Sequence, residues 1–550
     1  MMQSVSLKQI VTCCDALGSF VDAMLDPYSM ALVVGKLEGM VFTRQASRIL
    51  CAIEWKHPLE KIILDTISLY REKTGDDCKI FILLLKELMK SIKDKLETTD
   101  ETQLRRTISE EVTCLVTLLP TVFENVRNTF ARYSLVEFHS FPKDLEGLIL
   151  TFFHSKFSPN VSLKLTQLIC SFLSFTISNS NHAIESLSYL ILNFNVFCSK
   201  VILPLSHSVV LEGFAFTHRL LSSHEGKDIF VVVQELPQNF HDVICGLNSE
   251  SHLLQFWDSV EISLKYLKSK EISLILTSNR ASDNFESLCS QYKILIIDGI
   301  TKEDMDNILF FVDISPLVTL KDPLLPQNLG YVKTLKSVVV GNVSFAYMKI
   351  FSGCLRSMSP NHIILCAPME DVWKDYYSEC HNCLKVVRQW LHPHFNDLKY
   401  SGTKVNDEKI KEKCMKMQDK LKNSLLSDVL KSTVPYEKCA SISAFGVAFP
   451  MGLFEFSLKI ALAGMQENKL LCIKTLYDLL ESALLRVICK LWNTTIPNLE
   501  HEKSYVEFYE KIKKRISIPI EPASSKEHLV YMILQLIQQL MKIDTILCTK

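Results

Sequence analysis

The sequence predicts an α+β protein of several domains, in which two mainly helical segments flank an α/β segment. At 550 residues the chain exceeds what one compact core accommodates, so two to four domains are expected. Residues 1–200 carry amphipathic helical patterns, short β-type runs fill about 228–366, and helical patterns return from about 370. This order indicates that the α/β segment is inserted into a discontinuous helical domain.

The helical segments show clear periodicity. Residues 57–73 and 79–97 place apolar side chains at helical spacing, with charged residues on the opposite face. Ser524 and Glu527 have the spacing of a capping box ahead of an apolar helix over 529–543. Because the helices at 79–97 and 529–543 each carry an apolar stripe that needs a partner, we expect them to pack in one domain.

The middle segment reads as strands with helices between some of them. The β-type runs are mostly β-branched and bounded by turn residues: "DIFVVV", "ISLILTS", "YKILIID", "LKSVVVGNVSFAYMKIF" and "HIILC". One helical stripe precedes the strand at 272–276 and consists of Leu253, Trp257, Val260, Leu264 and Leu267. We expect this stripe to pack on the sheet, although contact with client proteins is an alternative.

Composition excludes several classes of protein. The net charge of −1 and the absence of a basic surplus argue against nucleic-acid binding. The most apolar stretches are too short or too interrupted for membrane insertion. The 18 cysteines are scattered, and the sequence "MMQSVSLKQIVTCC" lacks the features of a secretion signal. We therefore expect reduced, buried cysteines and a cytoplasmic protein.

Glycine is scarce, and this limits how a nucleotide could bind. The chain has only 16 glycines, and the closest pair is Gly35 and Gly39. No GG, GxG or GxxG sequence occurs, so the closely spaced glycines of Rossmann and Walker phosphate loops are absent.

Several stretches, in order along the chain, resemble group II chaperonin subunits. "TRQASRILCAIEWKHPLEKIILD" (43–65) resembles the stretch before the phosphate loop, and "TGDDCKIF" stands where chaperonins have GDGTT. "SVVLEGFAF", "HIILCAP…CHNCLKVVRQW", "FPMGLFE" and "MKIDTIL" are similar to later chaperonin signatures. Within this family the chain resembles the vertebrate chaperonin-like Bardet-Biedl proteins. One departure is the region around 400–440, which is much shorter than the long insertion that we associate with that branch.

The resemblance implies a division of the chain into five segments. The equatorial domain would comprise 1–120 and 394–550, and the intermediate domain 121–202 and 361–393. An apical α/β domain would span 203–360.

The resemblance also implies a degraded nucleotide site. The residues at positions of a residual ATP site are Gly75, Asp76, Lys79, Gly452, Glu455 and Asp544, and Asp76 would hold magnesium if Mg-ATP binds. No catalytic residue is expected, because Asn382 stands at the hydrolytic aspartate position and an amide is no general base.

Further substitutions in the motifs extend this picture. Asp77 replaces a phosphate-loop glycine, Gln45 replaces another family aspartate, and only Gly18 remains of a second phosphate loop near "DALGSF". An added carboxylate repels phosphate, whereas Lys79 would offset part of that repulsion. An acidic turn before a helix that begins near Lys79, residual ATP binding without turnover, and hydrolysis all remain open.

Other motifs favour structural roles. "CHNC" (380–383) has metal-ligand spacing but no second ligand pair, so buried helical cysteines are expected. "HPH" (392–394) is typical of a helix-ending turn, and Cys13-Cys14 of an apolar helix face. His57-Pro58 predicts a helix start, because proline fits the first helical turn.

Three function classes follow. The resemblance implies an assembly factor with little or no ATP hydrolysis, acting with other chaperonin-like Bardet-Biedl proteins and cytosolic chaperonin subunits. Its clients would be subunits of the BBSome, a ciliary trafficking complex, and its place the cytoplasm, with the centrosome, basal body or cilium as further sites. The alternatives are an ATP-dependent folding chaperonin subunit and an unrelated helical scaffold, which the β-rich middle segment opposes.

Overall fold

The computed structural model divides the chain into two compact units. The first comprises residues 1–162 and 382–550, and the second residues 163–381. The structure describes residues 2–22, 32–36, 39–43, 46–53, 55, 57–75, 78–133, 141–177, 183–217, 224–236, 250–312, 314–351, 361–391, 448–450, 452–467, 473–491, 520–543 and 545–547.

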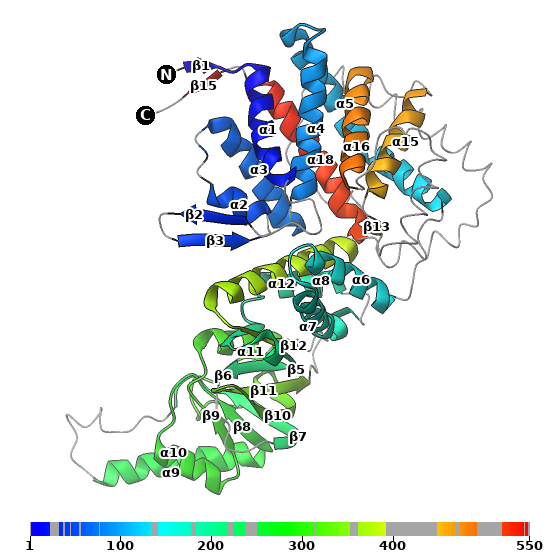
Figure 1. The fold of residues 1–550 in the computed structure, drawn as a ribbon. Helices are drawn as coiled ribbons and strands as arrows, with labels where there is room; N and C mark the ends of the chain where they lie inside the picture. The colour runs from blue at the N-terminus through cyan, green and yellow to red at the C-terminus, as the bar shows by residue number, and fades with distance from the viewer. Residues whose placement is uncertain are drawn as a thin grey trace. The chain divides into compact units, whose positions relative to one another are not determined.

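The first unit is mainly helical. Its N-terminal range contributes α1 (Leu7–Asp22), α2 (Ala46–Ala52), α3 (Pro58–Thr74), α4 (Lys79–Leu96), α5 (Glu101–Tyr133) and α6 (Phe141–His154). Its C-terminal range contributes α15 (Leu453–Glu467), α16 (Lys474–Leu491) and α18 (Ala523–Met541). Figure 1 shows α1, α4, α16 and α18 gathered into one bundle, although they come from opposite ends of the chain.

One hydrophobic core joins these helices. It contains Leu84 and Leu88 of α4 together with Leu536 and Ile537 of α18, all nearly inaccessible to solvent. The expected packing of these two helices in one core is therefore confirmed. The finer division into equatorial, intermediate and apical segments stays a prediction.

Three two-stranded ribbons belong to the same unit. β1 (Met2–Ser4) pairs antiparallel with β15 (Thr545–Leu547), β2 (Leu32–Lys36) with β3 (Gly39–Thr43), and β13 (Ala448–Pro450) with β14 (Ile520–Pro522). Among the described residues no further strand pairs with any of them. Each ribbon thus has unpaired edges within the described part of the chain.

The two helix starts predicted from sequence have different outcomes. His57 caps α3 as expected: its Nδ1 accepts a hydrogen bond from the Leu59 amide (3.3 Å), and Glu60 accepts one from the His57 amide (3.0 Å). The predicted capping box at Ser524 is wrong. α18 already begins at Ala523 after Pro522, and the Ser524 hydroxyl donates to the Gln389 carbonyl instead.

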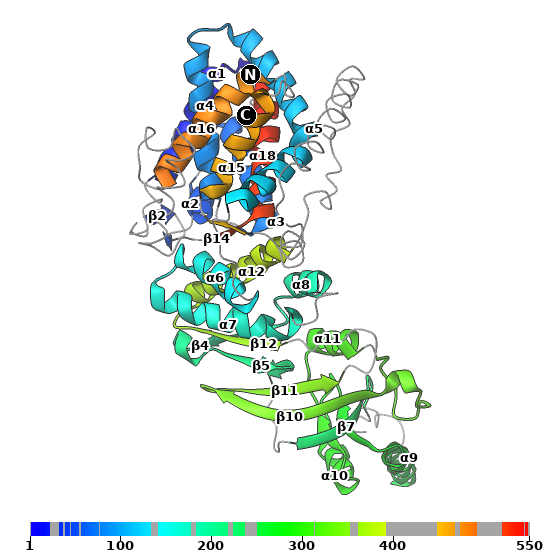
Figure 2. The same cartoon turned by 90° about the vertical axis from the view of Figure 1, so that its right-hand side faces the viewer.

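The second unit contains two sheets. A six-stranded sheet has the order β6-β11-β10-β7-β8-β9, and a three-stranded sheet the order β4-β12-β5. Their strands are β4 (Cys198–Ile202), β5 (Val209–Glu212), β6 (Phe214–Thr217), β7 (His224–Val232), β8 (Ile272–Leu276), β9 (Leu295–Ile297), β10 (Gly330–Val340), β11 (Val343–Phe351) and β12 (Asn361–Ala367). Figure 2 shows the long β10–β11 hairpin. The β-type runs predicted from sequence all form strands.

Helices accompany these sheets. They are α7 (Pro159–Ile177), α8 (Ala183–Leu192), α9 (Glu250–Ser269), α10 (Asp283–Gln291), α11 (Lys302–Val312) and α12 (Glu370–Leu391). Val260, Leu264 and Leu267 of α9 are buried in a core with strands β7 and β8, which confirms that this stripe packs on the sheet. α7 and α12 each cross the limit between the two residue ranges.

None of the helices in the described ranges combines the length and the apolar character that crossing a bilayer requires. The "HPH" turn lies outside the described residues, as do Gln45, Asp76, Asp77 and Asp544.

Candidate functional site

The turn that resembles a phosphate loop follows α3. Gly75 adopts a left-handed conformation (φ 75°), and its amide donates to the Arg71 carbonyl at 2.7 Å, which ends the helix. Cys78 has a φ of 62°, lies buried, and precedes the first residue of α4, Lys79. The helix predicted to begin near Lys79 is confirmed.

Gly75 and Asn382 lie against one another. A Cβ atom added to Gly75 would overlap the backbone carbonyl oxygen of Asn382 and lie 2.9 Å from Lys385 Cβ. Glycine is therefore required twice here, for the left-handed backbone and for the close approach of α12. Asn382 itself is only 6% exposed. The structure thus brings together two positions that lie about 300 residues apart in the printed sequence.

The C-terminal part of α12 links the end of α3 to the start of α18. Gln389 Nε2 donates to the Lys73 carbonyl at 3.2 Å, which satisfies one of the last carbonyls of α3. The Gln389 carbonyl in turn accepts the Ser524 hydroxyl of α18. Tyr70 of α3 and His528 of α18 stack with ring centroids 6.0 Å apart, so α3 and α18 also meet directly.

A buried ion cluster lies at the start of α18. Lys526 Nζ is 3.0 Å from Glu455 Oε1 and 2.7 Å from Glu521 Oε2. The side chains of Lys526 and Glu455 are 1% and 2% exposed. Charges removed from water are stable only when they are paired, so Glu455 and Lys526 depend on one another.

Helix dipoles support these carboxylates. Glu455 lies in the first turn of α15, and Glu521 directly precedes the Pro522 N-cap of α18. The N-terminus of a helix carries partial positive charge, which favours nearby anions. The two helix starts and Lys526 together compensate two carboxylates.

Buried polar atoms of α15 and α18 can still accept or donate hydrogen bonds. Glu455 Oε2, Ser457 Oγ and Ser525 Oγ are buried and make no hydrogen bond in the described part of the chain. Gly452 is buried with a φ of 83°, just before α15. These groups could meet a ligand, but Glu455 already serves Lys526 and Asn382 offers an amide in place of a carboxylate. No hydrolytic step can be derived from them. Gly75, Lys79, Gly452 and Glu455 as nucleotide contacts stay a prediction.

Lys526 and His528 are not among the site residues that the sequence predicts. Nothing local distinguishes Lys526 from an ordinary surface lysine before an apolar helix. Burial, with a smaller contribution from nearby Lys73, lowers the pKa of His528 to about 4. Only the three-dimensional packing of α18 reveals either group.

The cysteine motifs are structural, as predicted. Cys380 and Cys383 of "CHNC" are buried and form no disulfide within the described residues, and His381 Nε2 lies 2.9 Å from the Ile191 carbonyl oxygen. Cys13 and Cys14 are buried in α1, and burial raises the pKa of both thiols. Raised thiol pKa values disfavour the reactive thiolate.

Comparison with known proteins decides the family. Residues 18–395 match the model of the TCP-1/cpn60 chaperonin family. The chain belongs to this family. A crystal structure of a group III chaperonin in the open state is similar over 98% of both chains, with a TM-score of 0.60 and 13% identity. The predicted chaperonin-like α+β fold is confirmed.

Curated relatives are more specific in name. The chain is 22% identical over 449 residues to the "BBSome complex assembly protein BBS10" of Pongo abelii, and 23% identical over 446 residues to that of Homo sapiens. These alignments cover 74% and 73% of this chain, and 60% of each relative. The chain therefore spans about three fifths of the length of these relatives. The resemblance to chaperonin-like Bardet-Biedl proteins is confirmed.

Proposed function

We propose that this protein is a chaperonin-like assembly factor for the BBSome, and that it supports ciliogenesis and ciliary trafficking. The observation that carries the proposal is its similarity, over about three quarters of the chain, to proteins named for BBSome assembly. The chaperonin family match supports the same role, because binding of other polypeptides suits a chaperonin fold.

The protein works with little or no ATP hydrolysis. The Asn382 backbone lies against Gly75, and a side-chain amide at this position cannot accept a proton from water as a carboxylate does. Glu455 neutralises Lys526, so it is no substitute for the missing base. Binding of ATP and magnesium without turnover is compatible with the remaining groups.

Partner binding is the main activity, in a heteromeric complex with other chaperonin-like subunits and the cytosolic chaperonin. The open edges of the β1–β15 and β2–β3 ribbons support this, because such edges accept a strand from another chain. A ribbon of two short strands is marginally stable alone, which adds a reason for a partner. BBSome subunits are the clients.

Arg105 holds the terminal ribbon in place. Its Nη1 donates to the Ile543 carbonyl at 2.8 Å, and its Nη2 to the Val5 carbonyl at 2.9 Å. These carbonyls lie just after β1 and just before β15. Glu101 pairs with Arg105 at 2.8 Å and accepts the Leu7 amide at 2.7 Å. One ion pair therefore positions both strands.

The test is complementation in ciliated cells that lack the endogenous protein. We expect the wild-type chain to restore BBSome assembly, measured by sedimentation of its subunits. Arg105→Met should reduce both partner recovery and assembly, whereas Arg106→Met is the matched control because Arg106 forms only an exposed pair with Glu110 among the described residues. Normal assembly in cells that lack the protein would refute the proposed function.

A further inference from the structure

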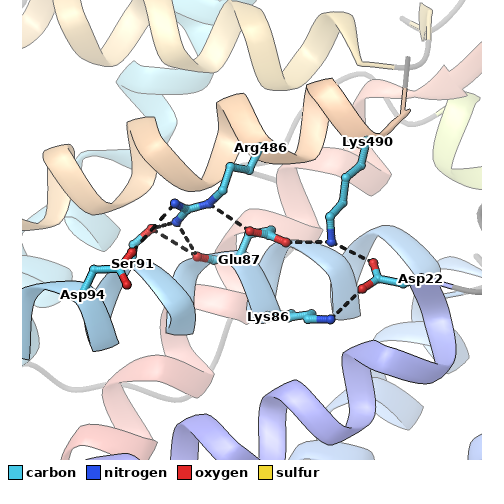
Figure 3. A network of polar contacts seen from close by, with 7 residues as sticks. All are labelled: Asp22, Lys86, Glu87, Ser91, Asp94, Arg486 and Lys490. Carbon is cyan, nitrogen blue, oxygen red and sulfur yellow. Dashed lines mark hydrogen bonds and ion pairs between the residues drawn. The ribbon is translucent and has the colours of Figure 1, made fainter. Parts of the chain in front are cut away.

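A charged network surrounds the end of α1 (Figure 3). Asp22, the last residue of α1, lies 2.6 Å from Lys86 Nζ of α4 and 2.8 Å from Lys490 Nζ of α16. Lys490 also lies 2.8 Å from Glu87, and Arg486 lies 2.9 Å from the other oxygen of Glu87. Three helices from distant parts of the sequence are thus joined by alternating charges.

The network is electrostatically matched. Burial alone raises the pKa of Asp22, but hydrogen bonds from Lys490 and Lys86 outweigh it and hold that pKa below its usual value. Burial lowers the pKa of Lys490, and its bonds to Asp22 and Glu87 more than reverse that effect. Lysine beside the last turn of α1 also compensates the negative end of the helix dipole.

Gly18 gives Lys86 its path to Asp22. Gly18 is buried inside α1, where glycine is a poor helix former relative to alanine. A Cβ atom added there would lie 2.9 Å from both Cβ and Cγ of Lys86, and would overlap its Cδ. Because residues four apart share a helix face, the notch at Gly18 leads directly to Asp22.

The contact is not relieved by a side-chain rotation. Lys86 Cβ is fixed by the backbone of α4, so a methyl group at position 18 would push α1 and α4 apart. The aliphatic stem of Lys86 fills the notch while its ammonium group stays at the network, as long cationic side chains commonly do.

We propose that Gly18 and Lys86 form a matched pair, a notch and the side chain that fills it, which locks the last turn of α1 onto α4 and α16. The contact requires glycine at position 18, and the end of α1 is fixed by the chain's own charges without a ligand. The lock is a conformational device of the first unit, and it holds whether or not the proposed function is correct.

Moving the glycine from α1 to α4 tests the contact. In the full chain, we would compare Gly18→Ala, Lys86→Gly and the double variant by thermal unfolding and by hydrogen exchange over residues 7–22. Each single variant should lower the melting temperature, and exchange in α1 should be faster by roughly tenfold or more. The double variant should lose less than the sum of the two single losses, because it removes the overlap at position 18, while the contact of the Lys86 ammonium group with Asp22 stays lost. A gain in stability for Gly18→Ala, as in an ordinary helix, or simple additivity of the two losses would overturn the proposal.

A second variant tests the charge. Lys86→Met keeps the stem in the notch and removes the ammonium group, so it should fold. We expect faster exchange at the last turn of α1, and a smaller dependence of that exchange on salt than in the wild type. Exchange equal to wild type at both low and high salt would exclude a role for the charge. A marked slowing of α1 exchange by Mg-ATP would contradict the claim that no ligand is needed.

Discussion

Two lysines of the first unit each bridge two carboxylates, yet their surroundings differ. Lys526, between Glu455 and Glu521, is 1% exposed. Lys490, between Asp22 and Glu87, is 34% exposed. The same chemical arrangement therefore occurs once inside the core and once near the surface.

Burial decides which of the two clusters contributes more to stability. Water solvates a partly exposed lysine after its partner is lost, so exposed ion pairs contribute about 0–1 kcal/mol. A buried carboxylate that loses its lysine has no such compensation, and the loss costs about 3–5 kcal/mol. We infer that the Lys526 cluster holds α15, β14 and α18 together, whereas the Lys490 network adjusts how α1 meets α4 and α16.

Removing each lysine in turn should produce a large difference in stability between the two clusters. Lys526→Met should lower the free energy of unfolding by about 3–5 kcal/mol. Lys490→Met should lower it by about 1 kcal/mol or less, because Asp22 is partly exposed and keeps Lys86, while the buried Glu87 keeps Arg486. Urea unfolding, followed by hydrogen exchange in α15 and α18, measures both.

A double variant separates charge from packing. Lys526→Met with Glu455→Gln removes the unpaired charge and should recover part of the loss of Lys526→Met. Equal losses for Lys526→Met and Lys490→Met would show that burial does not distinguish the two clusters.

The effect of low pH on stability can be compared for two histidines, one in each unit. Burial lowers the pKa of His362 on β12 to about 3, and burial with Lys73 lowers that of His528 to about 4. Both pKa values lie below the ordinary 6.5. At a pH between the folded pKa and 6.5, each histidine therefore binds more protons in the unfolded chain than in the folded chain. Stability is therefore complete above about pH 7 and falls as the pH falls toward each folded pKa.

The expected loss is about 2 kcal/mol for each histidine between pH 7.5 and pH 5. Hydrogen exchange resolves the two units, so His362→Gln should flatten the pH dependence in β12 and leave that of α18 unchanged. His362 lies 2.8 Å from the Ser199 hydroxyl, a bond that glutamine can replace. An unchanged slope in β12 would contradict the assignment.

Sequence patterns predict an element correctly where neighbouring residues determine it, and they fail where distant contacts do. His57 and Pro58 form a helix start from adjacent residues, and the β-type runs carry their own strand preference. Ser524 has an equally good local pattern, but the hydroxyl binds Gln389, 135 positions away. Lys526 with Glu455 and Lys86 with Gly18 are likewise set by packing. The proximity of Gly75 and Asn382 was implied by the family resemblance alone.

The rate of ATP hydrolysis by the protein should be close to zero. We expect purified protein to show negligible ATP turnover beside an authentic chaperonin subunit, because Asn382 provides no base at the Gly75 turn. Phosphate release in the presence of Mg-ATP measures it. Turnover equal to that of the chaperonin subunit, and abolished by Asp76→Ala, would show that the site is active.

The state in which the protein is recovered from ciliated cells shows whether it works by binding partners. We predict that it is found in a heteromeric complex with other chaperonin-like subunits. Asp76→Ala should barely alter this association, whereas Leu536→Asp should disrupt it, because Leu536 is 1% exposed in the core that joins both chain ends. A wild-type protein that is recovered as a stable monomer without partners would contradict the account.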